Sequence, residues 1–195
     1  MIKGKRVLLR TVEAGDLELC QSLFNDMDIK RMVVGWDFPV SMEAQKRWFD
    51  SLIGKKNEVR FVIETKAGKP IGLTGLWDID WHNRNALTAV KLILSNDTKG
   101  KGYGRDAIMT LGAYAFYDVG LNRLWSEIID YNEASLKAYV ERSGWKVEGQ
   151  FRKHIFRGGA FHDLYYVACL KEDFESVSDA KDYLRSYASP ANVKF

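Results

Sequence analysis

The stretch Lys99-Gly100-Lys101-Gly102-Tyr103-Gly104-Arg105, a glycine-rich turn in the middle of the chain, decides the fold. It follows a β-like run over residues 87–94 and precedes the most regular amphipathic pattern of the sequence. Glycines let a backbone bend until several N–H groups point the same way, and a following helix adds the positive end of its dipole. Three basic side chains flank those amides. The turn therefore predicts a site for a phosphate or diphosphate, and hence for a nucleotide-bearing cofactor.

Downstream of the turn, the pattern predicts a helix, a strand and a second helix. The first helix ends at Gly120, and its apolar face is formed by Ile108, Leu111, Gly112, Ala115, Phe116 and Val119. Residues 123–129 alternate with a period of two, which indicates a strand. Asn132 is placed to cap the second helix, and Gly144 to end it.

Around this segment the sequence predicts an antiparallel meander before the turn and a hairpin at the end. The expected elements are a strand over 7–10, helices over 13–25 and 41–52, strands over 59–64, 71–81 and 86–94, a hairpin of 146–156 with 161–170, and a helix over 179–187. They add up to an α/β (α+β mixed) fold with a mixed, largely antiparallel sheet of about seven strands, flanked by helices and followed by an extra C-terminal helix.

The composition limits the function classes. A net charge of +3, with basic residues scattered among acidic ones, lacks the concentrated basic face of a nucleic-acid binder. No apolar run approaches a membrane span, and the first residues lack the apolar core of a signal peptide. Cys20 and Cys169 have no C-x-x-C spacing, and the three histidines are scattered. We therefore expect a cytoplasmic protein without a metal, a nucleic-acid partner or a membrane contact.

The turn also fits the dinucleotide fingerprint G-x-G-x-x-A over residues 102–107, with Glu127 where a ribose-binding acid could lie. A Rossmann-type NAD(P)-dependent oxidoreductase is therefore an alternative. Against it, the strands before the turn form a meander, whereas the fingerprint belongs to the first β-α-β unit of a parallel sheet. A tight strand-to-helix turn with solvated lysines is the simplest structural explanation of the turn taken alone.

A second motif follows the turn: Asn132, Ser135 and Tyr139 form N-x-x-S-x-x-x-Y, and Gly144-Trp145 comes after it. With the turn, residues 86–145 resemble the acetyl-CoA-binding core of the GCN5-related N-acetyltransferase (GNAT) superfamily. Residues 5–174 resemble its branch of ribosomal-protein N-terminal (RimJ/RimL-like) and spermidine acetyltransferases. Lys99 stands where the family has Gln or Arg. The resemblance implies a GNAT domain over 1–174, a helical tail over 175–195, and acetyl transfer from acetyl-CoA to a primary amine of a small molecule or a protein N-terminus.

The resemblance also implies roles for single residues. The diphosphate of CoA would lie on the turn, Lys99 to Arg105, and the pantetheine arm would pair with the strand Leu92-Ile93-Leu94. Asn132 and Ser135 would contact the cofactor, although Asn132 has capping as an equally good explanation. Tyr139 would protonate the leaving thiolate; by spacing alone it is a core tyrosine. A catalytically inactive CoA-binding or sensing module is a further alternative.

The acceptor half is left open by the sequence. It is rich in aromatic residues and aspartates, which suit a cationic amine but are explained as well by core packing and solvated acids: Trp36, Phe38, Trp48, Phe49, Trp77, Trp81, Asp37, Asp78 and Asp80. A base must take a proton from the amine, and Glu64, Asp78, Asp80 and Glu127 are equal candidates. The tail helix is a candidate surface for a second subunit in a homodimer.

Overall fold

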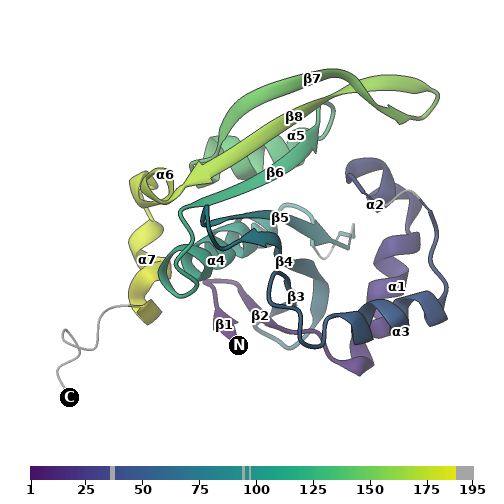
Figure 1. The fold of residues 1–195 in the computed structure, drawn as a ribbon, viewed down its shortest axis with the longest axis horizontal. Helices are drawn as coiled ribbons and strands as arrows, with labels where there is room; N and C mark the ends of the chain where they lie inside the picture. Colours follow the sequence, from purple (N-terminus) through teal and green to yellow (C-terminus); the bar gives the residue numbers. More distant parts are fainter. Residues whose placement is uncertain (36–37, 94, 97, 188–195) are drawn as a thin grey trace.

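The computed structural model describes residues 1–35, 38–93, 95–96 and 98–187, and in this part of the chain eight strands form one sheet (Figure 1). Their order is β1-β2-β3-β4-β5-β6-β8-β7. Neighbours are antiparallel except for β5 and β6, which are parallel. The strands are β1 (Ile2–Lys3), β2 (Val7–Thr11), β3 (Val59–Thr65), β4 (Pro70–Asp80), β5 (Asn85–Leu92), β6 (Arg123–Ile129), β7 (Lys146–Arg157) and β8 (Ala160–Leu170).

The helices gather in two groups on either side of the strands. In Figure 1, α1–α3 lie at the right, α4, α6 and α7 lie at the left, and the long β7–β8 hairpin crosses above them. The helical elements are η1 (Ala14–Asp16), α1 (Leu17–Asn25), α2 (Met27–Met32), α3 (Met42–Ser51), α4 (Tyr103–Tyr117), α5 (Glu133–Leu136), the π-helical segment η2 (Lys137–Glu141), α6 (Lys171–Ser176), α7 (Ala180–Leu184) and η3 (Arg185–Tyr187).

The predicted mixed, largely antiparallel sheet is confirmed, with eight strands in place of about seven. Three short elements have no clear signal in the sequence: β1, α2 and α6. β1 has two residues, too few to show an alternation. α2 has six residues, and it begins at Asp26, whose side chain accepts from the N–H groups of Asp28 and Ile29. These elements are too short for periodicity to reveal.

The connection between β5 and β6 decides between the two nucleotide-binding alternatives. It passes through the glycine turn and α4, and β5–β6 is the parallel pair of the described sheet. A dinucleotide-binding fold needs several parallel strands in succession. The oxidoreductase alternative is therefore wrong for this fold.

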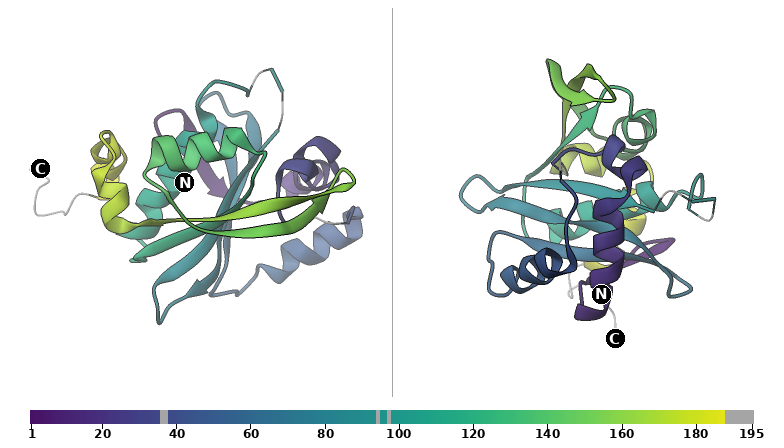
Figure 2. Two further views of the ribbon diagram at one scale, coloured as in Figure 1. Left: turned by 90° about the horizontal axis from the view of Figure 1, so that it is seen from above. Right: turned by 90° about the vertical axis from the view of Figure 1, so that its right-hand side faces the viewer.

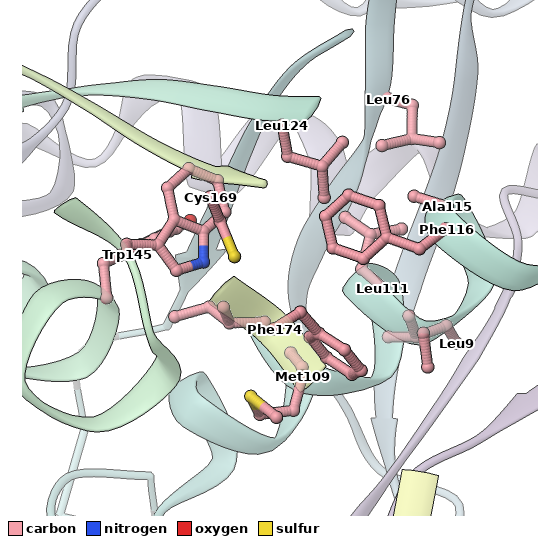
Figure 3. Packing of buried hydrophobic residues seen from close by; sticks show 14 of the residues in the cluster. Leu9, Leu76, Met109, Leu111, Ala115, Phe116, Leu124, Trp145, Cys169 and Phe174 are labelled. Carbon is pink, nitrogen blue, oxygen red and sulfur yellow. The ribbon is translucent and has the colours of Figure 1, made fainter. Parts of the chain in front are cut away.

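Two hydrophobic clusters cover the two faces of the sheet. Figure 2 shows the sheet and its helices from two further sides, and Figure 3 shows the packing within the larger cluster. The larger joins the sheet to α4 and the tail, and its members include Leu9, Leu76, Met109, Leu111, Phe116, Leu124 and Phe174. The smaller joins the sheet to α1 and α2, and it contains Val12, Cys20, Leu23, Ile29, Val62 and Leu73. Residues that are paired on neighbouring strands point to the same face of a sheet. The residues of β3, β4 and β5 that are in register with Val62 and Leu73 therefore also face α1–α3.

Asp106, in the first turn of α4, ties the start of the chain to the glycine turn. Its buried carboxylate accepts from the backbone N–H groups of Lys5, Arg6 and Val7, at 3.1, 2.7 and 2.8 Å. It also accepts from the hydroxyl of Tyr183 in α7, at 2.7 Å. One carboxylate thereby holds the bend between β1 and β2, the base of α4 and the tail together.

Replacing Gly4 with alanine should destabilise the protein by about 2 kcal/mol, because this bend has no room for a side chain. A Cβ at Gly4 would lie 2.3 Å from Oγ1 of Thr110 and 2.6 Å from Oδ2 of Asp106. Both atoms are held in place, Thr110 by its hydrogen bond to the Asp106 carbonyl. Urea denaturation measures the change, and Gly15→Ala, in open space, is the control. Equal stabilities of the two variants would show that the bend is not tightly packed.

The tail packs on its own chain. Ala180 and Tyr183 of α7 are buried against the cluster that covers α4. The described helix ends with η3 at Tyr187, as the sequence predicts for its C-terminal helix. Docking of this helix on a second subunit stays a prediction, and the buried face of α7 is not free for it.

Candidate functional site

The glycine turn has the geometry of an anion cradle. Gly100 and Gly102 have φ angles of +75° and +77°, which side-chain-bearing residues rarely adopt, and Gly102 is the N-cap of α4. The first N–H of α4 with a backbone partner is that of Asp106, which donates to the Gly102 carbonyl at 3.0 Å. Among the described residues, no acceptor reaches the N–H groups of residues 103–105. These amides are therefore oriented and available to an anion.

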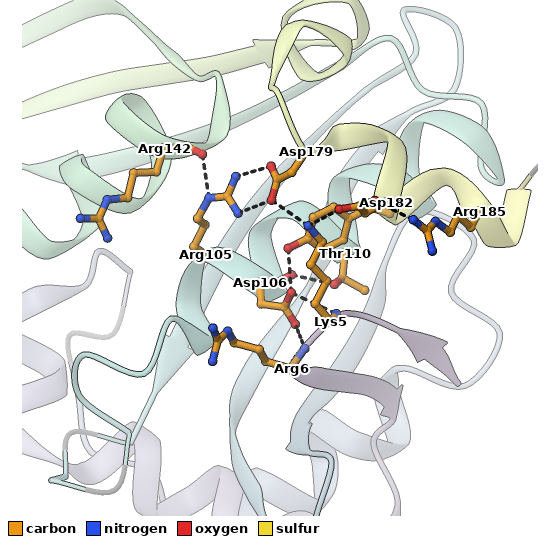
Figure 4. Close-up of polar contacts among 10 residues, drawn as sticks. Lys5, Arg6, Arg105, Asp106, Thr110, Arg142, Asp179, Asp182 and Arg185 are labelled. Carbon is orange, nitrogen blue, oxygen red and sulfur yellow. Dashed lines mark hydrogen bonds and ion pairs between the residues drawn. The ribbon is translucent and has the colours of Figure 1, made fainter.

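The Arg105 side chain is engaged elsewhere (Figure 4). Its guanidinium donates to both carboxylate oxygens of Asp179, at 2.9 and 2.6 Å, and to the Arg142 carbonyl at 2.8 Å. Lys5 also binds Asp179, at 2.9 Å. The Arg105 guanidinium, with Lys5, holds the pKa of the Asp179 carboxyl well below its usual range. The group that Arg105 leaves for an anion is its backbone N–H, whereas Lys99 and Lys101 are exposed at the turn.

The parallel strands β5 and β6 are paired at their N-terminal ends and diverge toward their C-terminal ends, where the chain leaves β5 for the glycine turn. They pair only from Asn85 with Arg123 to Leu87 with Trp125. Past that point a cavity of about 260 Å³ separates them. Its lining comes from both faces of the sheet: Val90, Ser126, Ser135 and Tyr139 on the side of α4 and α5, and Trp48, Arg60, Trp77, Lys91 and Glu127 on the side of α1–α3. The cavity thus connects the two faces through the sheet.

The open edge of β5 lies at residues 88–92, beyond its pairing with β6. Of the predicted pantetheine-pairing residues, Leu92 ends this strand, and its side chain lies 3.6 Å from where a Cβ of Gly104 would be. Ile93 already uses both backbone groups, because its N–H donates to Ile71 and its carbonyl accepts from the Thr98 hydroxyl. Leu94 lies outside the described residues. The backbone groups available to a pantetheine arm therefore lie at residues 88–92, earlier in the chain than the predicted residues 92–94.

Asn132 and Ser135 both line the cavity at the start of α5. The side-chain oxygen Oδ1 of Asn132 accepts from the Ser135 N–H at 3.1 Å, which confirms the predicted cap. Its amide nitrogen donates to the Met32 carbonyl at 2.8 Å, so that Asn132 also joins α5 to the end of α2. No local pattern indicates this second contact, which joins residues 100 positions apart. A ligand at this point would meet Ser135 and the rim that Asn132 holds.

Tyr139 lies in the π-helical segment η2, and its ring packs edge-on against Trp145 with the centroids 4.8 Å apart. Its hydroxyl is buried at the cavity and has no hydrogen bond of normal geometry with any described residue. Burial raises the pKa of this phenol, and the nearby Val90 backbone and Ser126 side chain act in the opposite direction. Buried hydroxyls are almost always paired, so an orphan at a cavity indicates a site for a ligand atom.

The four candidate bases differ in their contacts and in whether they line the cavity. Glu64 is bound to Arg10 at 2.7 Å, and Asp80 accepts from the Asn83 N–H at 2.8 Å in a turn. Neither these two nor Asp78 line the cavity, whereas Glu127 does. No hydrogen bond or ion pair from a described residue holds the Glu127 carboxylate. Burial raises its pKa, and nearby His154 acts in the opposite direction.

The predicted aromatic wall is only partly present. Trp48 and Trp77 line the cavity, whereas Phe38 and Trp81 are exposed, and Trp36 and Asp37 lie outside the described residues. Two cations, Arg60 and Lys91, line the same wall, and no local pattern in the sequence singles them out. Among the described residues, no group of three or more His, Cys, Asp and Glu side chains is placed to hold a metal ion. No helix in the described ranges is long and apolar enough to cross a membrane.

Comparison with known proteins identifies the family. Residues 6–146 match the model of the acetyltransferase (GNAT) domain. The spermidine N(1)-acetyltransferase of Vibrio cholerae is 26% identical over 177 residues, 90% of this chain and 99% of that protein. YokL, an uncharacterized N-acetyltransferase derived from the SPbeta prophage of Bacillus subtilis, is 26% identical over 172 residues, 88% of this chain and 94% of that protein.

The fold agrees with these matches. A crystal structure of the Vibrio cholerae spermidine N-acetyltransferase, in complex with CoA and spermine, has a TM-score of 0.79 at 24% identity and covers 87% of this chain and 98% of that one. The family model spans the glycine turn, the diverging strands and Tyr139. The chain therefore belongs to the GNAT acetyltransferase family and is an acyltransferase.

Proposed function

We propose that the protein transfers an acetyl group from acetyl-CoA to a primary amine, by direct attack of the amine in a ternary complex. The observation that carries this proposal is the orphaned Tyr139 hydroxyl, buried at a cavity that passes through the sheet. A general acid is needed there when a thiolate leaves, and a phenol supplies one. Family membership, together with a relative whose structure contains CoA, supports acetyl-CoA as the donor.

The residues on the α4 side fit a CoA molecule. The diphosphate would accept from the N–H groups of Tyr103, Gly104 and Arg105, and Lys99 and Lys101 would screen its charge. The amides of the pantetheine arm would pair with the open edge of β5 at residues 88–92, past its contact with β6. Asn132 and Ser135 line the cavity beside this edge of β5.

Acetyl-CoA supplies the acetyl group as a thioester, whose carbonyl carbon is the point of attack. Glu127 takes a proton from the incoming ammonium, because its carboxylate lines the cavity on the α1–α3 side. As the nitrogen–carbon bond forms and the carbon–sulfur bond breaks, Tyr139 gives its proton to the sulfur from the opposite face. The attacking nitrogen then loses its second proton through solvent, which restores the Tyr139 phenol, and Glu127 releases the proton it took to solvent. A backbone N–H of the open β5 edge stabilises the negative charge on the carbonyl oxygen.

A thiol-release assay tests the proposal directly. The full chain is mixed with acetyl-CoA and a panel of amines, namely peptides, polyamines, amino sugars, aminoglycosides and amino acids, and free CoA thiol is followed. Turnover with at least one class of amine, and an acetylated product of the expected mass, is the predicted result. Binding of CoA without turnover across the panel would favour a sensing module instead.

The two buried free thiols, Cys20 and Cys169, agree with a proposed location in the reducing cytoplasm.

A further inference from the structure

Two cations share one aromatic ring on the acceptor side of the cavity. The guanidinium carbon of Arg60 lies 3.9 Å from the ring centroid of Trp77, and the Lys91 ammonium lies 5.9 Å from the same centroid. These residues come from β3, β4 and β5, and all three line the cavity. Arg60 and Lys91 are in register with Gly75 and Leu73 of β4, on the face toward α1–α3.

The backbone is shaped to hold Arg60 in this position. Gly75 is the residue opposite Arg60, and a Cβ there would lie 3.0 Å from Cδ of Arg60 and 2.3 Å from the Val59 carbonyl oxygen. The missing side chain lets Arg60 lie flat across the strand and reach Trp77. Glu58 fixes its Nε at 2.6 Å. The two terminal nitrogens of the guanidinium have no hydrogen-bond partner among the described residues, although the charge of Asp78 acts on the guanidinium, and they form the edge that binds a carboxylate.

The charges around the cavity are unequal. Its described lining carries the two cations and one acid, Glu127. Burial is the main cause that lowers the pKa of Lys91 to about 7, and the neighbouring Arg60 adds to it, so that an anion bound beside Lys91 would favour its charged form. Glu58 binds Arg60 only at Nε, and it is shared with Lys55. A carboxylate bound at the terminal nitrogens of Arg60 would therefore add a second acceptor to the one that its Nε already has in Glu58.

We propose that the acceptor is a zwitterion, an amine that also carries a carboxylate, whose carboxylate binds Arg60 and Lys91 while its amine faces Glu127. This inference rests on the proposed acetyl transfer and names the substrate class of the same site. It departs from the polyamine named for the Vibrio cholerae relative. A polyamine is a polycation, and two cations on the acceptor wall would repel it.

Matched amines test the carboxylate. Short ω-amino acids of graded length, from glycine upward, are compared with the alkylamine and the diamine of the same length in the thiol-release assay. For the best length, kcat/KM of the amino acid should exceed that of both matched amines by about 10-fold or more, as one charge-assisted hydrogen-bonded pair provides. The Arg60→Gln variant should reduce this preference to about 2-fold. Arg47→Gln, an exposed α3 residue away from the cavity, should leave the preference unchanged.

The outcomes separate this inference from the proposed function. Acetylation of alkylamines or diamines as fast as of the matched amino acids would overturn the zwitterion and leave acetyl transfer intact. A preference that survives Arg60→Gln would also overturn it, because the carboxylate would then be bound elsewhere. Absence of thiol release with every amine would overturn acetyl transfer itself, and this inference with it.

Discussion

Replacing Tyr139 with phenylalanine should lower kcat by about 100-fold or more while the Kd for CoA stays within about 2-fold. The variant keeps the ring on Trp145 and removes only the hydroxyl, which is the proposed proton donor to the leaving sulfur. No described residue depends on that hydroxyl for a hydrogen bond, so its loss should leave the free energy of unfolding nearly unchanged or slightly increased. Steady-state kinetics, CoA titration calorimetry and urea denaturation measure the three quantities.

A structural tyrosine would behave in the opposite way, with lower stability and nearly normal turnover. Tyr117→Phe is the matched control, because the Tyr117 hydroxyl binds Glu175 far from the cavity. We expect this control to keep full kcat. Undiminished turnover in Tyr139→Phe would remove the residue from the mechanism and leave the proton donor unassigned.

Replacing Glu127 with glutamine should lower kcat/KM by about 100-fold and abolish the acidic limb of its pH profile. A base works only when ionised, so activity rises with pH as Glu127 loses its proton. Because burial raises the pKa of this carboxyl, the limb should lie above the ordinary glutamate value of 4.5. The measurement is kcat/KM against pH for the parent and the variant, with two amines of different pKa to identify the limb that belongs to the enzyme.

The control for Glu127 is Glu141→Gln, an exposed change in η2 that does not line the cavity. It should leave both the rate and the pH profile as they are. If Glu127→Gln keeps the acidic limb and most of its activity, the amine loses its proton to water or to another group. The assignment of the base would then be wrong, although the donor side of the site would be unaffected.

Local patterns in the sequence suffice for much of the fold and of the donor side. The glycine turn, the cap at Asn132 and the alternation of Arg123–Ile129 each arise within a few residues, and the structure has the corresponding turn, cap and strand. They could be predicted because each depends on the neighbouring residues alone. Family resemblance then added Tyr139, which by its spacing is indistinguishable from a core residue.

Contacts between distant parts of the chain could not be predicted in this way. Asp179 binds the guanidinium of Arg105, which lies 74 residues earlier in the sequence. Asn132 donates to the Met32 carbonyl, which lies 100 residues earlier. The Arg60 side chain lies across Gly75 onto Trp77 only because β3 and β4 pair in one particular register. Glu127 is one of four equivalent carboxylates in the sequence, and only its place beside the diverging strands β5 and β6 distinguishes it. These features depend on tertiary packing, which no local period encodes.

A crystal structure of the protein with bound CoA is the most direct measurement of where the reaction takes place. The diphosphate should lie on the N–H groups of Tyr103, Gly104 and Arg105, and the sulfur should enter the gap between β5 and β6, about 3–4 Å from the Tyr139 hydroxyl. CoA bound on another surface, or a sulfur remote from Tyr139, would contradict acetyl transfer through this cavity.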